Sequence, residues 1–323
     1  MKNLDSSRYR TPRAISKGLA LIFVFASCVI TAQAVEPGPK VSRMNRIIEL
    51  METGQPAIGI FSQNLSPRTA AWIASSKLDF VVIDLEHSPY DPSRLETYLL
   101  AMTDKRKILQ KSSLQPNVVP IVRVPTAGRE QLLFVIKQVL DLGPMGVLVP
   151  HVDNAEDARA AVRACRYPQP KGSALFKPEG MRGVGNDWAA RQWGLTRTEY
   201  TEQADLWPLD PKGEMLLWLM IETRRAVENI EEIVQVPGIG GFFIGPADLS
   251  HSLSVQRGDP ELESAIQKVL AACRNANVPC GIFDPNVTKR TKQGFQFMAV
   301  GVDAGVSKSV NAALMQADEL RRK

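Results

Sequence analysis

The stretch Gly241–His251, GFFIGPADLSH, contains the features around which the rest of the chain is organised. An apolar run with aromatic and β-branched residues ends at Gly245-Pro246, and a carboxylate, Asp248, follows before Leu249-Ser250, which can begin a helix. This order predicts a buried strand, a tight turn and a helix start. Such a unit directs backbone N–H groups and one side chain into a common pocket.

A second apolar run, in LLWLMIETRR, ends on the carboxylate of Glu222. Two carboxylates at the ends of neighbouring buried strands, Glu222 and Asp248, suit one divalent cation with oxygen ligands. The same spacing also fits a structural explanation, in which Asp248 caps the next helix and Glu222 pairs with Arg224 or Arg225. Spacing alone leaves both explanations open.

Working outward from these two runs, we predict eight strands, because eight near-continuous apolar runs alternate with helical patterns. Such runs are typical of strands that are buried on both faces. The predicted strands are 57–62, 80–86, 118–124, 146–152, 215–222, 241–245, 280–284 and 297–303. The predicted helices are 44–52, 67–76, 93–102, 129–142, 155–165, 226–234, 260–275 and 287–293. The alternation predicts an α/β protein with a single (β/α)₈ TIM barrel.

One connection, residues 166–213, interrupts this alternation with many Pro, Gly, Trp and charged residues and with weak periodicity. A loop of this length in a compact domain is usually functional or forms a subunit contact.

The N-terminal 34 residues account for the basic character of the chain. They read as a secretory signal peptide, with a basic segment, a short apolar run and the small-x-small pattern Ala32-Gln33-Ala34. Without their five basic residues and one acidic residue, 34 basic and 33 acidic residues remain, so we expect no nucleic-acid partner. We therefore predict a signal peptide at 1–34, a linker at 35–43 and the barrel at 44–323, with cleavage near Val35 and a periplasmic or secreted product. A retained membrane anchor is the alternative.

The cysteines predict no disulfide framework, because three remain after cleavage, Cys165, Cys273 and Cys280. Cys273 and Cys280 are close enough in sequence to pair, but we expect free buried thiols.

Polar side chains gather where the predicted strands end, which is where barrels of this kind place their active sites. They are Asp84, Glu86, His87, Arg123, His151, Glu222, Asp248 and His251, and they include all three histidines of the chain. A histidine beside Asp84 can act as a general base. Arg123 suits an oxyanion or carboxylate, although a salt bridge to Asp141 or Glu86 explains it equally simply.

Eight blocks occur along the chain in this order: IDLEHSPYD, PIVRVP, IKQVLDLG, VLVPHVDNAEDARAAVRACRYP, MRGVG, MIETRRAVENI, GFFIGPADLS and MAVGVD. In these blocks the chain resembles the HpcH/HpaI class of metal-dependent pyruvate aldolases, typified by 4-hydroxy-2-oxoheptanedioate aldolase. The resemblance implies cleavage or formation of a C–C bond in a 4-hydroxy-2-oxo acid, giving pyruvate and an aldehyde through a metal-stabilised enolate. It implies a TIM barrel of the phosphoenolpyruvate/pyruvate-binding type. It also implies Mg²⁺, Mn²⁺ or Co²⁺ as the cation and a homo-oligomer, usually a hexamer.

The same resemblance assigns roles to individual positions. It implies that Glu222 and Asp248 are the metal ligands and that the backbone of Ala247 and Asp248 holds the pyruvate carboxylate. It further implies catalytic roles for four side chains: His87 as the base, Asp84 as the acid that orients it, Arg123 on the keto-acid oxygens, and Asp141 as an acid supporting the arginine or the aldehyde end.

The chain departs from the family pattern at several positions. Met220 stands where glutamine is common, His151 where methionine is common and His251 where alanine is common, and the RYP block is followed by an insertion. The alternatives to an aldolase are a lyase or decarboxylase acting on a related oxo acid, hydroxy acid or acyl-CoA, and a non-catalytic periplasmic binder of oxo acids. The intact His87 and Asp84 argue against the binder, which needs no base.

Overall fold

The computed structural model of the protein describes residues 43–126, 128–303 and 308–322. The predicted signal peptide and residues 35–42 of the predicted linker lie outside these ranges. Within the described residues, no helix combines the length and the apolar character needed to cross a membrane.

Eight parallel strands close into one barrel in which each strand pairs with its neighbours in the sequence and β8 pairs with β1. The strands are β1 (Ala57–Ser62), β2 (Phe80–Asp84), β3 (Val119–Arg123), β4 (Gly146–Val149), β5 (Leu216–Ile221), β6 (Gly241–Ile244), β7 (Cys280–Phe283) and β8 (Phe297–Val302). The predicted (β/α)₈ barrel is confirmed. All eight predicted strands are present, and the largest difference is in β4, which was expected to run to residue 152.

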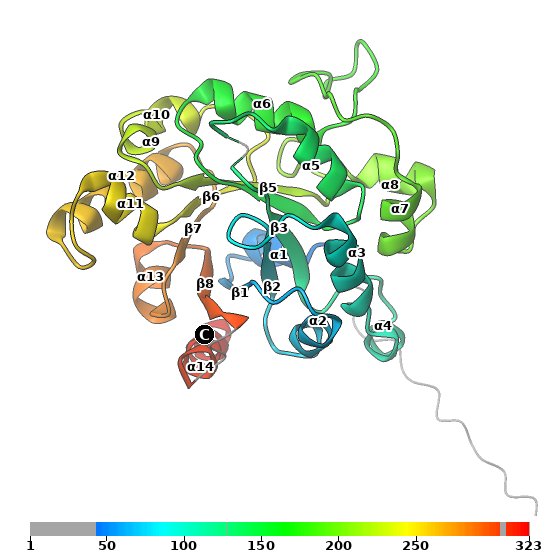
Figure 1. Ribbon diagram of the computed structural model, residues 1–323, viewed down its shortest axis with the longest axis horizontal. Helices are drawn as coiled ribbons and strands as arrows, with labels where there is room; N and C mark the ends of the chain where they lie inside the picture. The colour runs from blue at the N-terminus through cyan, green and yellow to red at the C-terminus, as the bar shows by residue number, and fades with distance from the viewer. Residues whose placement is uncertain (1–42, 127, 304–307, 323) are drawn as a thin grey trace, which may run out of the picture. The chain divides into compact units, whose positions relative to one another are not determined.

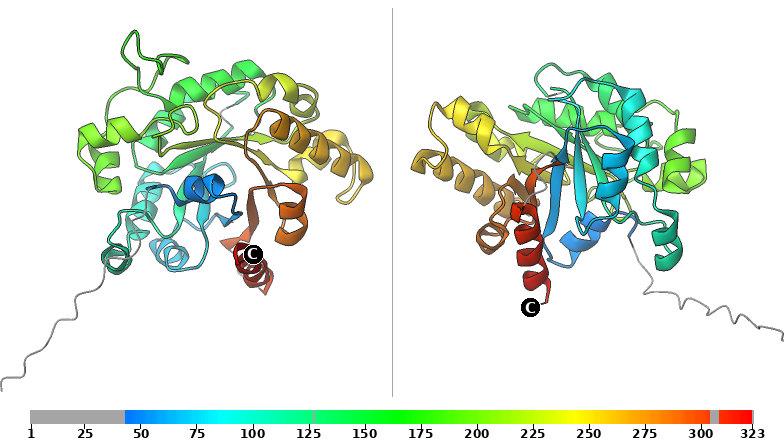
Figure 2. Two further views of the ribbon diagram at one scale, coloured as in Figure 1. Left: turned by 180° about the vertical axis from the view of Figure 1, so that it is seen from behind. Right: turned by 60° about the horizontal axis from the view of Figure 1, so that its bottom comes forward.

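Helices surround the barrel (Figure 1). They are α1 (Arg46–Glu52), α2 (Pro67–Ala74), α3 (Pro92–Ala101), α4 (Lys105–Lys111), α5 (Leu133–Leu140), α6 (Ala155–Cys165), α7 (Asp187–Trp193), α8 (Arg197–Gln203), α9 (Arg224–Glu228), α10 (Ile230–Ile233), α11 (Pro246–Leu253), α12 (Pro260–Asn275), α13 (Val287–Gln293) and α14 (Lys308–Arg321). Proline occupies the first turn of α2, α3, α11 and α12, where its missing N–H costs no helical hydrogen bond. α1 lies behind the strands in Figure 1 and in front of them in the reverse view of Figure 2.

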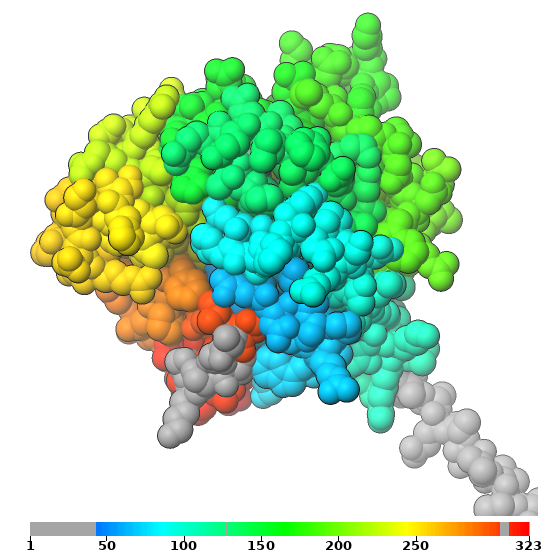
Figure 3. Space-filling view, viewed as in Figure 1, coloured from blue at the N-terminus to red at the C-terminus, as the bar shows by residue number. Residues whose placement is uncertain are grey.

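Several helices differ from the sequence-based expectation. The helix predicted at 226–234 is two short helices, α9 and α10, and the one predicted at 129–142 begins only at Leu133. The long connection, residues 166–213, contains α7 and α8, and it forms the green projection at the upper right of Figure 3. Its helices are short, and the hydrophobic periodicity of a single turn or two is too brief to recognise in sequence.

The barrel interior is packed with large aromatic side chains. Trp218 of β5 stacks on Phe297 of β8 with ring centroids 4.2 Å apart, and Phe80 of β2 meets the same indole edge-on at 5.3 Å. Glycine makes room for this packing: a Cβ at Gly281 would lie 2.2 Å from the Phe297 ring. The filled interior closes the barrel below the strand ends, so the functional groups are confined to its rim.

Candidate active site

The rim begins with a paired acid and base on adjacent strands. Asp84 and Arg123 are the last residues of β2 and β3, and the sheet register places them side by side. Arg123 donates from Nε to Asp84 Oδ1 at 2.9 Å and from Nη2 to Oδ2 at 2.6 Å. Burial works to raise the pKa of Asp84, but the hydrogen bonds and charge of Arg123 outweigh it, so this pKa lies below its ordinary value.

The guanidinium of Arg123 has three further neighbours, Glu86, Met220 and Phe61. Its Nη1 lies 2.9 Å from Glu86 Oε2 and 3.9 Å from the sulfur of Met220, and its Cζ lies 4.7 Å from the centre of the Phe61 ring. The salt bridge to Glu86 that the sequence left open is therefore present. Arg123 also lines a cavity, so this salt bridge is compatible with the binding of an oxyanion or carboxylate there.

Glu222 follows β5 and is almost completely buried, with 2% of its surface exposed. Its Oε1 accepts the backbone N–H of His151 at 2.9 Å, and among the described residues no arginine or lysine pairs with it. Burial, and then the negative charges of Glu86 and Asp248, raises the pKa of Glu222 to about 8, although the His151 N–H opposes the rise. The carboxylate is thus buried without a permanent positive partner, which is costly unless a cation completes the site.

The structural explanations for the two carboxylates are not supported. Among the described residues, neither Arg224 nor Arg225 forms an ion pair with Glu222. Arg224 instead lies 3.8 Å from Glu261 and donates to the carbonyl oxygen of Leu253. Asp248 lies in the first turn of α11, whose cap, Gly245, has no side chain to bond the helix start. Both carboxylates are left facing the rim.

The turn between β6 and α11 brings the backbone close to Glu222. A Cβ at Gly245 would lie 2.9 Å from Glu222 Oε2, so only glycine fits this approach without a shift. α11 begins at Pro246, earlier than expected, and the N–H groups of Ala247 and Asp248 belong to its first turn, where a helix has no internal acceptors. Both residues line the cavity.

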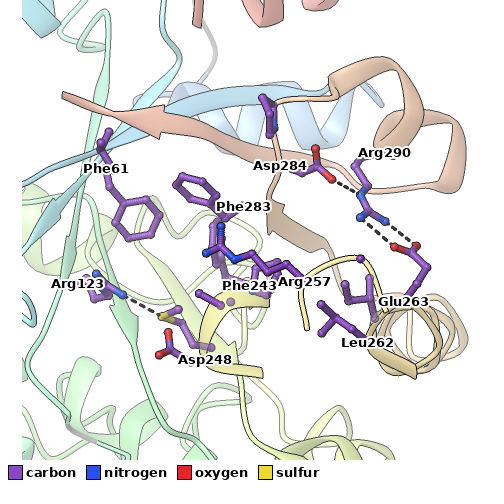
Figure 4. Close-up of a pocket in the computed structure, with 18 of the residues that line it drawn as sticks. Phe61, Arg123, Phe243, Asp248, Arg257, Leu262, Glu263, Phe283, Asp284 and Arg290 are labelled. Carbon is purple, nitrogen blue, oxygen red and sulfur yellow. Dashed lines mark hydrogen bonds and ion pairs between the residues drawn. The ribbon is translucent and has the colours of Figure 1, made fainter. Parts of the chain in front are cut away.

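The cavity itself has a volume of about 730 Å³ and runs from the rim toward the loop between α11 and α12. Its inner end contains Arg123 and Asp248, and its walls include Phe61, Phe243 and Phe283, as Figure 4 shows. It is large enough for a small organic acid with room at the far end.

A comparison with known proteins identifies this arrangement. The HpcH/HpaI aldolase/citrate lyase family matches residues 57–309. The chain belongs to this family. It is 36% identical over 267 residues to a 4-hydroxy-2-oxo-heptane-1,7-dioate aldolase of Klebsiella pneumoniae, covering 80% of this chain and 88% of the relative. It is also 36% identical over 256 residues to a 2-keto-3-deoxy-L-rhamnonate aldolase of the same organism, covering 77% of this chain and 84% of the relative.

Solved structures agree. A HpcH/HpaI aldolase/citrate lyase family protein from Burkholderia cenocepacia superposes with a TM-score of 0.65 at 27% identity, covering 86% of this chain and 98% of that one. The predicted family and the predicted enzyme class, an aldolase-type carbon–carbon lyase, are therefore confirmed.

The HpcH/HpaI aldolases depend on a divalent metal, and the donor set of this chain fits one. Four carboxylates converge on the rim, Asp84, Glu86, Glu222 and Asp248, and among the described residues Arg123 is the only arginine or lysine that forms an ion pair with any of them. The excess negative charge and the buried, unpaired Glu222 are what a divalent cation with oxygen ligands would neutralise.

Two sequence-based assignments within the family site need correction. Asp84 binds Arg123, and its one hydrogen bond from His87 comes from the backbone N–H, at 3.3 Å, so it does not hold the His87 ring in this structure. That ring is half-exposed and its nearest acid is Glu86, with Nε2 3.9 Å from Oε2. His87 lines the cavity and stays at the rim, but Asp84 orients the arginine.

Asp141 does not reach the arginine of the site. It is the C-cap residue of α5 and pairs with Lys137 and with Arg182, whose Nη2 lies 3.1 Å from Asp141 Oδ1. α5 runs back from the rim, so its C-terminal end lies near the start of β4 and away from the strand ends. In the described chain Asp141 therefore supports the long connection.

Sequence reasoning missed two polar contributions to this site. Gln63, directly after β1, donates to Asp84 Oδ2 at 3.1 Å, and its place after a strand was the available signal. Arg257 enters the cavity from the loop between α11 and α12, and no strand end marks that loop in the sequence.

Proposed function

We propose that this chain cleaves, and in reverse forms, the C3–C4 bond of a 4-hydroxy-2-oxo acid, giving pyruvate and an aldehyde. The observation that carries the proposal is the buried Glu222 carboxylate without a permanent positive partner. It lies behind Gly245, which lines the same cavity as Arg123 and Asp248. A site with more acids than bases suits a cation-dependent reaction of a bound anion.

Glu222 and Asp248 would hold the cation. When bound, a divalent cation supplies positive charge beside the 2-oxo group, which favours the build-up of negative charge on the pyruvate fragment. Mg²⁺, Mn²⁺ and Co²⁺ are the candidates that the family resemblance implies.

The residues of the chain would act on the substrate as follows. Arg123 donates N–H groups to the keto-acid oxygens, and the free N–H groups of Ala247 and Asp248 hold the carboxylate at the start of α11. The His87 ring accepts the proton of the 4-hydroxyl group. The C3–C4 electron pair passes to the 2-oxo group as the aldehyde carbonyl forms, and protonation at C3 then gives pyruvate.

Isotope exchange tests this proposal without knowledge of the aldehyde. In D₂O with a divalent metal and no aldehyde, the methyl protons of pyruvate should exchange, and proton NMR would record their loss. Excess EDTA should stop the exchange and added metal should restore it. Exchange that persists at full rate in EDTA would reject the metal-dependent assignment, and no exchange with metal bound would favour an oxo-acid binder.

The outer cavity favours substrates with a second carboxylate at the aldehyde end. In Figure 4 the Arg257 side chain lies beside Phe243 and Phe283, and it has no hydrogen bond or ion pair within the described part of the chain. The nearby acids Glu263 and Asp284 are both bound to Arg290, at 2.7 Å each, which leaves Arg257 available for a ligand. The Klebsiella relative is named for a heptane-1,7-dioate, which carries such a group.

We also propose export and self-association. The basic, apolar and small-residue order of residues 1–34 supports a cleaved signal and a mature chain that begins near Val35. Mass spectrometry of protein isolated from its native cell tests this, since an intact Met1 in the cytosol would contradict it. Light scattering of the mature protein tests the homo-oligomer, with a hexamer expected from the family resemblance.

A further inference from the structure

His151 has an unusual backbone at the centre of the site. It follows β4 and Pro150 with φ of 55°, in the left-handed region that residues other than glycine seldom occupy. Its own N–H is the donor to Glu222 Oε1, so the strained backbone and the buried carboxylate are held together. Strain of this kind is costly and persists where the surroundings fix a functional geometry.

The ring of His151 lies between two carboxylates that belong to different strand ends. Its Nδ1 is 3.7 Å from Glu222 Oε1, and its Nε2 is 3.7 Å from Glu86 Oε1. One ligand atom from each of these three residues lies within 4.8 Å of the other two. Two atoms bound to one cation at about 2.0–2.2 Å each are up to about 4.4 Å apart, so small side-chain adjustments bring all three into contact with a single ion.

We propose that His151 is a nitrogen ligand of the divalent cation, together with Glu222 and Glu86. The proposal rests on the proposed function in that it concerns the same cation. It goes beyond the expected pair of oxygen ligands, Glu222 and Asp248, by adding the imidazole of His151 and the carboxylate of Glu86.

An imidazole ligand changes which metal the site favours. Mg²⁺ takes oxygen ligands and keeps several waters, whereas imidazole suits later first-row metals. We therefore expect this chain to favour Co²⁺ or Zn²⁺ over Mg²⁺, with Mn²⁺ between them. Methionine is common at this position in the family pattern. It has no imidazole, so it would not create this preference for Co²⁺ or Zn²⁺.

Arg129 competes with the metal for the ring. Its Nη2 lies 3.0 Å from His151 Nδ1, and its guanidinium also repels a cation. Because the Arg129 side chain is 57% exposed, it can turn into solvent when a metal binds. Arg129→Gln should therefore tighten metal binding, which is the opposite of what loss of a supporting residue would do.

Pulsed electron paramagnetic resonance of the full-length, untagged protein with Mn²⁺ and no substrate tests the ligand directly, because it detects the nitrogen of a bound imidazole. We expect a nitrogen coupling in the wild type and in His251→Gln, which changes a histidine on the exposed side of α11. The coupling should vanish in His151→Asn and in His151→Gly, two residues that tolerate the left-handed backbone. Thermal unfolding would verify that both variants are folded.

Metal titrations of the metal-free protein give a second measurement. His151→Asn should weaken Co²⁺ binding by at least ~10–100-fold, the loss usual even for residues that only support a ligand, and Mg²⁺ binding by much less. Equal losses for the two metals would overturn the proposal. So would a wild-type signal without nitrogen coupling, or a coupling that survives in both His151 variants and disappears in His87→Gln.

The two proposals fail separately. If only oxygen atoms bind the cation, pyruvate would still exchange with Mg²⁺. That result would reject the His151 ligand and leave the aldolase proposal unaffected. A nitrogen coupling without any pyruvate exchange would instead establish the ligand and reject the aldolase reaction.

Discussion

Two buried arginines, one at the rim and one in the long connection, use the same chemistry to different ends. Arg123 binds Asp84 through two nitrogens, at 2.6 and 2.9 Å, and Arg166 binds Asp205 in the same way, at 2.6 Å for both contacts. The remaining N–H groups of Arg166 donate to the carbonyl oxygens of Leu175 and Pro178. Those of Arg123 face Glu86 and the cavity.

The difference between the two regions is in their charge balance. In the connection, the charge of Arg166 is balanced by the one carboxylate of Asp205, and its remaining N–H groups bind backbone carbonyl oxygens. We call this the closed pair, because it stabilises the fold and leaves no group free for a ligand. The rim brings Glu86, Glu222 and Asp248 near Arg123 and Asp84, and this leaves negative charge for a cation to neutralise. A buried ion pair by itself therefore does not indicate function, whereas an unbalanced group of buried charges does.

The largest effect is expected from a substitution that removes one of these unbalanced charges. Glu222→Gln should lower metal-dependent pyruvate exchange by ~10³-fold or more, because the cation loses its buried ligand and each tenfold loss corresponds to about 1.4 kcal/mol. NMR exchange rates and metal titration would measure it. Glu319→Gln, a matched change at an exposed position of α14, should leave both unchanged. Full pyruvate exchange in Glu222→Gln would show that the catalytic cation does not bind at Glu222.

The next effect breaks the closed pair in the connection. Arg166→Ala should lower the free energy of unfolding by about 3–5 kcal/mol, because Asp205 is left buried and uncompensated. Urea unfolding would measure this loss, and the KM of the remaining folded enzyme should not change. Arg159→Ala, at an exposed position of α6, the helix that ends next to Arg166, should alter stability by no more than about 0.5 kcal/mol. A change in KM with unchanged stability would mean that the connection takes part in the site.

A smaller loss is expected at the rim arginine. Arg123→Ala should weaken pyruvate binding by about 1.5–3 kcal/mol, the usual contribution of a hydrogen bond to a charged group. Arg123→Lys keeps the charge but loses the two-pronged geometry, so it should fall between the wild type and the alanine variant. Calorimetric titration of pyruvate onto folded variants measures all three. Equal affinities would show that Arg123 serves only Asp84 and Glu86.

The smallest effect tests the outer end of the cavity. Arg257→Gln should raise the KM of a dicarboxylic 4-hydroxy-2-oxo acid about two- to fivefold, as expected for an exposed charge pair worth ~0.2–1 kcal/mol. The KM of a substrate without the second carboxylate should not change, which makes it the internal control. An equal rise for both substrates would indicate that Arg257 shapes the cavity without selecting a charge.

The sequence alone determined the barrel and the end of it that carries the chemistry. Short near-continuous apolar runs are typical of strands buried on both faces, and eight of them alternating with helices leave few arrangements other than a closed barrel. All parallel strands then end on one side, so Arg123, Glu222 and Asp248 could be assigned to a common rim from their places after apolar runs.

Only the tertiary structure decided which of those groups touch. The sequence offered Asp141 or Glu86 as partners of Arg123, and the β2–β3 register supplied Asp84 as well, while Asp141 went to Arg182. The left-handed turn at His151 had no sequence signal either, because the residue is not glycine. Order along a strand fixes which end a side chain reaches. Its partner depends on register, turn geometry and rotamer, which are set by packing between segments far apart in the chain.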